Sequence, residues 1–155
     1  MTPAALPSAQ WLDVVARTPL VSIDLIVLDD AGRVLLGWRR NRPAQNSWFV
    51  PGGVVRKDES LDAAFARIAE AELGVALSRA QTEFVGVFEH RYDDNFAAAP
   101  GITTHYVVLA HRVRLAALPE RPADDQHGAF RAFSVEQLRV EPAVHRYTRA
   151  YFTEV

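Results

Sequence analysis

Residues 48–75 constrain the fold more than any other part of the chain. They begin with a short apolar run, pass through two glycines and a charged loop, and continue into a periodic segment. Apolar residues spaced i, i+4, i+7 and i+8 over residues 61–73 predict an amphipathic helix. Gly74 is expected to end this helix, and Ser60 or Asp58 to cap its start. A strand, a glycine turn and a charged helix in succession let backbone groups and carboxylates approach one phosphate and metal site.

The same segment resembles the Nudix box. In that motif a glycine, five residues, a glutamate and seven residues precede R-E-U-x-E-E-x-G-U, where U is aliphatic. The residues that fall on the pattern are Gly53, Glu59, Arg67, Glu72, Gly74 and Val75. Two positions depart from it, because Ile68 and Ala71 stand where the motif has glutamates, and Glu70 occupies an unassigned position. The resemblance implies a Nudix-type α/β/α sandwich with a mixed sheet between helices.

Composition bounds the remaining possibilities. A chain of 155 residues fits one compact domain spanning 1–155. A formal charge of −2 gives no footprint for nucleic acid or a membrane surface. The absence of cysteine excludes disulfides, thiolate metal sites and cysteine nucleophiles. With no signal peptide and no apolar run long enough to span a bilayer, we expect a cytoplasmic protein.

The pattern outside the box predicts a strand-rich chain with helical ends. A helix capped by Ser8 is expected to stop at Pro19, and to pack on its own domain or on a neighbouring subunit. The predicted strands cover residues 20–28, 33–38, 81–92, 102–115 and 130–133. Further helices are expected at 134–138 and 145–152. Strand-rich blocks that flank a helix indicate an α/β sandwich.

Two polar features interrupt this pattern. Asp24 lies in the middle of an apolar strand, where burial without a partner would be costly, so it requires hydrogen bonds or a ligand hydroxyl. Arg39, Arg40 and Arg42 follow the second strand. Such a cluster suits a diphosphate, because a guanidinium binds phosphate oxygens with two parallel hydrogen bonds. Arg39 is favoured because it continues the strand toward the box.

The helix of the box keeps one of its three usual metal-binding carboxylates, Glu72. Mg²⁺ commonly takes one or two carboxylates together with carbonyls, waters and phosphates, so the residues support one metal ion rather than a cluster. The lost glutamates also remove the usual carboxylate bases. Gln126 and His127, in a loop near the end of the chain, offer a metal ligand and a general base, although a surface loop with an ordinary histidine has the same sequence.

Longer segments resemble the GDP-mannose mannosyl hydrolase branch of the Nudix family. The matching phrases include NRPAQNSWFVPGG, FVGVFEHRYDDNF, TTHYVVL and DDQH. This branch lacks the same two carboxylates. The resemblance implies hydrolysis of GDP-mannose, and of GDP-glucose, by water attack at sugar C1 with inversion and release of GDP. One Mg²⁺ ion is implied, with Mn²⁺ as a substitute, and so is a homodimer to which residues 1–18 contribute.

The resemblance also implies roles for individual residues. His127 matches the general base, Arg39 an arginine on the diphosphate, and Asp24 a residue contacting the substrate. The implied metal ligands are the Gly52 carbonyl, Glu72 and Gln126. The other implied substrate-binding residues are Arg67, His90 and Tyr106.

Alternatives remain open from the sequence. Val54 stands where members of the branch carry an arginine, which puts substrate affinity and the choice of nucleotide sugar in doubt. A nucleotide-sugar pyrophosphatase would attack phosphorus and use Glu70 or Glu59 as its base. A non-catalytic module that only binds a nucleotide sugar would need no base at all.

Overall fold

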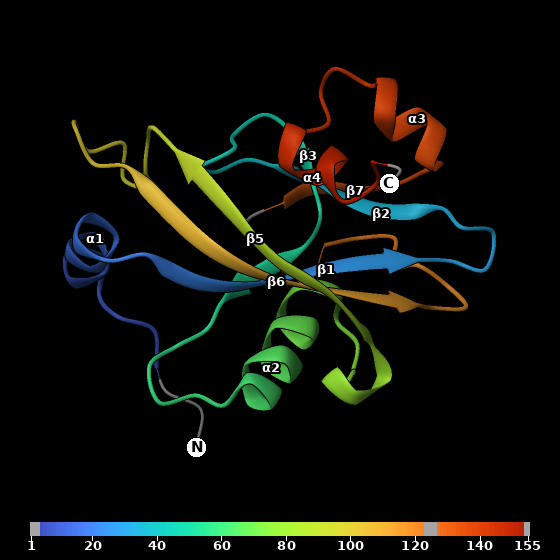
Figure 1. The fold of residues 1–155 in the computed structure, drawn as a ribbon, viewed down its shortest axis with the longest axis horizontal. Coiled ribbons are helices and arrows are strands. Elements are labelled where there is room, and N and C mark those ends of the chain that lie inside the picture. The colour runs from blue at the N-terminus through green and yellow to red at the C-terminus, as the bar shows by residue number, and fades with distance from the viewer. Residues whose placement is uncertain (1–3, 123–126, 154–155) are drawn as a thin grey trace.

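Seven strands and four α-helices make up the described part of the protein (Figure 1). This computed structural model describes residues 4–122 and 127–153. The helices are α1 (Ser8–Arg17), α2 (Leu61–Leu73), α3 (Val135–Val140) and α4 (Arg146–Ala150), with a 3₁₀ turn η1 (Arg79–Gln81). The strands are β1 (Leu20–Leu28), β2 (Val34–Arg39), β3 (Trp48–Phe49), β4 (Gly52–Val54), β5 (Glu83–Tyr92), β6 (Thr104–Arg114) and β7 (His127–Phe133).

Strand β1 is the centre of the sheet. It pairs in parallel with β6 along all of its residues, and antiparallel with β4 and with the start of β2. The strand order β3-β2-β1-β6-β5 is completed by β4 beside β1 and β7 beside β2. Because the parallel pair lies among antiparallel ones, the sheet is mixed, as predicted.

Helices cover both faces of this sheet (Figure 1). Alternate residues of a strand point to opposite faces, so Ile23, Leu25 and Val27 pack under α2 while Ile26 joins the other face. The second face is closed by Leu138 of α3 and by aromatic residues of α4 and the chain after it. The protein therefore has the predicted α/β/α architecture.

Helix α2 forms where the periodicity predicts it. Ser60 is the N-cap, and its hydroxyl oxygen accepts a hydrogen bond from Ala63 N at 3.1 Å. Gly74 follows the last turn with φ of 69°, a left-handed conformation in which a side chain would be strained. Phe65 and Ile68 are buried against the sheet. The helix is thus fixed at both ends and along one face.

The glycines of the box form a strand rather than a turn. Gly52 and Gly53 pair with Asp24 and Ile23 of β1. Backbone hydrogen bonds from Leu25 N to Pro51 O and from Val55 N to Val21 O, both 2.8 Å, hold the two ends of this pairing. Glycines carry no alternating side-chain pattern, so the sequence gives no strand signal there.

Helix α1 differs from expectation only at its start. Pro7 occupies the N-cap position and Ser8 is the first helical residue. Val15 is the buried residue of this helix, which packs beside β6. Its contribution to a dimer stays a prediction. None of the helices in the described chain has the length and apolar character needed to cross a bilayer.

Replacing the cap of α2 tests which residue closes its start. Ser60→Ala is expected to lower the free energy of unfolding by about 1 kcal/mol, because Ala63 N loses its hydrogen-bond acceptor. Urea denaturation measures this change. Asp58→Asn is the control, since asparagine tolerates the positive φ of 66° at that position. A larger loss in the control would assign the cap to Asp58.

Candidate active site

The sheet brings three of the predicted site residues to one face and a fourth close to them. Asp24 of β1 lies on the face covered by α4, with 7% of its surface exposed. His90 and Tyr106 pair directly across β5 and β6 on that same face. Arg39, at the end of β2, lies close enough to influence Asp24 electrostatically. Residues far apart in sequence thus gather around one buried carboxyl group.

The Asp24 carboxyl is the electrostatic centre of this group. Burial raises its pKa to about 7, and the opposing influences are a hydrogen bond from Tyr151 and the charge of Arg39. Asp24 and Arg39 also act in opposite directions on the pKa values of Tyr92 and Tyr106, which burial raises. The charges of Asp24 and Arg39 thus act on the same group of buried side chains. Binding of a proton or a cation there would change the net charge of the group.

The three arginines after β2 have different surroundings. Arg42 forms an ion pair with Asp94 at 3.0 Å, and Arg40 is exposed. Arg39 is half-buried, and its Nη2 donates to the Pro43 carbonyl at 3.2 Å. Its proximity to Asp24 makes Arg39 the member of the cluster best placed to meet a ligand there.

Two imidazoles on this face are neutral near neutral pH. Burial, together with the charge of the neighbouring His145, lowers the pKa of His90 to about 4. Burial and two nearby arginines lower the pKa of His145 to about 4 as well. The ring of His90 stacks on Tyr147, with centroids 4.3 Å apart and planes 7° from parallel. These rings form an aromatic cluster, largely uncharged at neutral pH, on the Asp24 face of the sheet.

Gly52 and Gly53 connect this face with helix α2. A Cβ on Gly52 would lie 2.5 Å from the Ile23 carbonyl oxygen and 2.6 Å from Asp24 Oδ1. A Cβ on Gly53 would lie 3.0 Å from the Ile68 side chain. Since residues four apart share a helix face, Glu72 lies one turn beyond Ile68 on the side facing the sheet, and it is buried.

This donor set fits a single divalent cation. Because Gly52 has no side chain, its backbone lies closer to Asp24 and to the Ile23 carbonyl than a residue with a Cβ would allow. Glu72 supplies one buried carboxylate. The described residues hold no cluster of three or more histidine, aspartate or glutamate ligands. One or two carboxylates, carbonyl oxygens and water are a usual Mg²⁺ environment. Gln126, the third predicted ligand, lies outside the described residues.

Arg67, a predicted substrate-binding residue, contacts the protein itself. Its guanidinium donates to both oxygens of Glu59, at 2.7 and 2.8 Å, and to the Val54 carbonyl at 2.8 Å. Glu59 Oε1 also accepts from Arg56 N at 3.0 Å. These bonds lower the pKa of Glu59 and tie the charged loop to α2. The described contacts of Arg67 shape the loop that follows β4.

The predicted base stands at the start of β7. The backbone of His127 pairs with Arg39 of β2, next to an irregularity in the register after Gly37. Arg39 therefore links the start of β7 to the group around Asp24. Asp124 and Asp125, like Gln126, lie outside the described residues.

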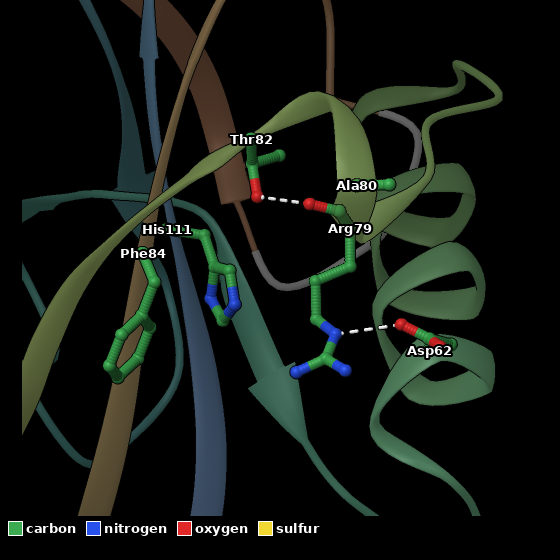
Figure 2. A pocket seen from close by; sticks show the side chains of 6 residues that line it. All are labelled: Asp62, Arg79, Ala80, Thr82, Phe84 and His111. Carbon is green, nitrogen blue, oxygen red and sulfur yellow. Dashed lines mark hydrogen bonds and ion pairs between the residues drawn. The ribbon is translucent and has the colours of Figure 1, made fainter.

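A separate cleft of about 390 Å³ lies on the α2 side of the sheet (Figure 2). Its lining residues are Asp62, Arg79, Ala80, Thr82, Phe84 and His111. Arg79 Nε donates to Asp62 at 2.7 Å, and the His111 ring packs 5.4 Å from Phe84. None of the residues predicted to act on substrate lines this cleft.

The fold and the box together define a known class of protein. A model of the NUDIX domain matches residues 18–154. The chain belongs to the Nudix hydrolase family, whose members use divalent metal ions such as Mg²⁺.

Relatives and solved structures agree with this assignment. The chain is 40% identical over 146 residues to "Low-salt glycan biosynthesis protein Agl8" from Haloferax volcanii, covering 94% of this chain and 90% of that protein. A MutT NUDIX hydrolase from Burkholderia pseudomallei is 27% identical, with a TM-score of 0.69 over 88% of this chain and 97% of its own. The NUDIX domain of Shewanella oneidensis NrtR, solved with ADP ribose, shares the fold at 16% identity, with a TM-score of 0.66 over 94% and 96% of the two chains.

Sequence reasoning missed the contribution of the C-terminal segment. Tyr151 donates a hydrogen bond to Asp24, while His145 and Tyr147 pack around His90. The sequence carries one usable signal, because aromatic residues and a histidine recur there at helical spacing. Helical spacing of aromatic residues by itself indicates packing against the core. It does not identify β1 as the strand that this segment contacts.

Replacing Asp24 by asparagine should stabilise the metal-free protein as pH rises. The folded-state pKa of about 7 exceeds the ordinary value, so the stability that protonated Asp24 supplies at low pH is lost between about pH 4 and pH 7. Asp24→Asn carries no charge to bury. Its free energy of unfolding relative to the wild type is expected to grow by about 3 kcal/mol from about pH 4 to pH 8.

Denaturant melts in EDTA at several pH values measure this difference. Asp29→Asn is a control of opposite sign, because hydrogen bonds from Arg33 lower the pKa of Asp29. The stability that ionised Asp29 contributes is lost as pH falls. The free energy of unfolding of Asp29→Asn, relative to that of the wild type, should therefore be highest at low pH. A pH-independent difference for Asp24→Asn would contradict the burial of a titrating carboxyl.

Proposed function

We propose that the protein hydrolyses GDP-mannose, and related GDP-hexoses, to GDP and the free sugar. Water attacks C1 of the sugar, the bond from C1 to the β-phosphate oxygen breaks, and the configuration at C1 inverts. The protein acts on a small nucleotide sugar with one bound Mg²⁺ ion and works as a homodimer.

The observation that carries this proposal is the composition of the α2 surface. Ile68 is packed against Gly53, Ala71 is exposed, and Glu72 remains as the buried carboxylate of the helix. Several metal ions, as hydrolysis at phosphorus often employs, would need more acidic ligands than this. Attack at carbon needs a neutralised leaving group and a base placed away from the metal.

The name of one relative supports a sugar nucleotide as substrate. The Haloferax volcanii relative is named for glycan biosynthesis, and the alignment covers nearly all of both proteins. Glycans are assembled from nucleotide-activated sugars. A family member that binds such a molecule would meet both a diphosphate and a hydroxyl-rich ring.

Each proposed role matches the chemistry of the residue that fills it. The Gly52 carbonyl, Glu72 and Gln126 would hold Mg²⁺, which when bound neutralises charge on the diphosphate. His127 takes the proton of the attacking water. Arg39 stabilises the negative charge that develops on departing GDP, since a guanidinium binds phosphate oxygens with paired hydrogen bonds.

The sugar is held by groups on the α4 side of the sheet. Asp24 accepts a hydrogen bond from a sugar hydroxyl, and His90 and Tyr106 bind beside it. These three side chains share one face with the partly exposed ring of Tyr151. A buried acceptor of this kind discriminates strongly between hydroxyl-bearing ligands and those that lack the hydroxyl.

The pyrophosphatase alternative has weaker support. Glu70 is exposed on α2, and the carboxylate of Glu59 is engaged by Arg67 and the Arg56 backbone. Neither is placed as a free base beside Gly52. A binding module would bind GDP-mannose without converting it to product, which distinguishes it from the hydrolase and from the pyrophosphatase.

Product analysis tests the reaction directly. The protein incubated with GDP-mannose and Mg²⁺ in ¹⁸O-water should release GDP free of ¹⁸O and β-mannose labelled at C1, as followed by NMR and mass spectrometry. Formation of GMP and mannose 1-phosphate would show attack at phosphorus. Absence of any product would favour the binding module.

Substitution of the proposed base gives a second test. His127→Gln is expected to lower kcat by about 10²–10⁴ with little change in substrate affinity, because proton transfer is lost while the binding contacts remain. Steady-state kinetics and calorimetric titration separate the two effects. Glu70→Gln serves as the matched control and should retain turnover; the reverse pattern would transfer the base to α2.

A further inference from the structure

The segment that ends in helix α4 is anchored on the sheet by backbone bonds. Trp48 N donates to Ala143 O at 2.8 Å, and His145 N donates to Trp48 O at 3.0 Å, which adds a parallel bridge beside β3. The buried Thr148 hydroxyl accepts from Val50 N at 3.2 Å. Because these contacts do not depend on exposed side chains, α4 holds its own side chains in fixed positions over the candidate site.

Tyr151, directly after α4, reaches the carboxyl of Asp24. Its hydroxyl donates to Asp24 Oδ2 at 2.5 Å, a length typical of an O–H bond to a carboxylate. The rings of Phe88 and Tyr151 form a T-shaped contact, with centroids 4.8 Å apart and planes at 87°. The hydroxyl has a single proton to donate, and that proton is used on Asp24.

The other oxygen of the carboxyl lies close to Gly52 of β4. Asp24 Oδ1 lies 2.6 Å from the point that a Cβ on Gly52 would occupy. The hydrogen bond from Tyr151 therefore restricts rotation of the carboxyl about the Cβ–Cγ bond of Asp24. One oxygen is directed toward Tyr151, at the end of α4, and the other toward Gly52 of β4. The phenol of Tyr151 is thus a direct hydrogen-bond donor that fixes Oδ2.

Tyr147 provides a contrast on the same helix. Its hydroxyl donates to Arg91 O and accepts from Arg91 N, both at 2.9 Å, and its ring stacks on His90. It thus joins α4 to the end of β5 through a half-buried ring and a bonded hydroxyl, as Tyr151 joins the end of α4 to β1. Its hydrogen bonds go to backbone atoms and not to the Asp24 carboxyl.

We propose that Tyr151 is a positioning residue of the active site, which orients the Asp24 carboxyl so that a substrate hydroxyl meets a fixed acceptor beside Gly52. The role rests on the proposed function only in naming that hydroxyl as part of a nucleotide sugar. Preset orientation of a binding group removes the need to order it during the reaction. Tyr151 acts through Asp24 and not on the substrate itself.

A double-mutant cycle tests this dependence. Tyr151→Phe is expected to lower kcat/KM for GDP-mannose by about tenfold in the wild-type background, and by less than about twofold in the Asp24→Ala background. Tyr147→Phe is the control, which keeps its ring and loses a hydroxyl that bonds to the Arg91 backbone and not to Asp24. Its effect should be the same in both backgrounds. Equal losses from Tyr151→Phe in the two backgrounds would overturn the proposal.

The same cycle measured on unfolding separates this inference from the proposed function. Urea denaturation of the four proteins should show that Tyr151→Phe destabilises the wild type and not Asp24→Ala, whatever the substrate is. If the wild type does not convert GDP-mannose to GDP, the proposed function fails. If the unfolding cycle shows no coupling, the positioning role fails even when turnover is normal.

Discussion

The parallel pairing of β1 with β6 is the interaction on which the rest of the structure depends. It runs the full length of β1 and leaves that strand with neighbours on both edges, because β4 and β2 take the other edge in turn. A strand placed in this way is buried on both faces, so every polar side chain on it must be satisfied within the protein. Asp24 is the ionisable residue of this strand, and its burial accounts for the polar groups that surround it.

Several contacts then follow from one buried carboxyl. The tyrosine hydroxyl, the nearby guanidinium and the glycine beside it each lie where Asp24 requires a donor, a charge or space. Retaining such a group lowers stability, and proteins commonly keep costly polar groups at functional sites. The chemistry of the site and the packing of the sheet are therefore set at the same position of the same strand.

The sequence predicted those elements whose signal is local. Val, Ile and Leu around two polar residues predicted β1 with its observed bounds, and helical spacing with a serine cap and a final glycine predicted α2. It also indicated that Asp24 needs a partner. It could not name that partner, because Tyr151 is 127 residues away in sequence and the two meet only through the docking of α4. The strand formed by Gly52 and Gly53 was missed since its pattern lies in backbone pairing and not in side chains.

The packing of Ile68 against Gly53 has a consequence for how this protein can evolve. Ile68 is 1% exposed, lies in an apolar cluster and packs directly against Gly53 of β4. A glutamate at position 68 would therefore bury a carboxylate among apolar side chains. Position 71 is exposed and could regain an acid at little cost to folding. An acidic residue is thus compatible with folding at position 71 and not at position 68, so the packing of Ile68 against Gly53 limits how many carboxylates this helix can acquire.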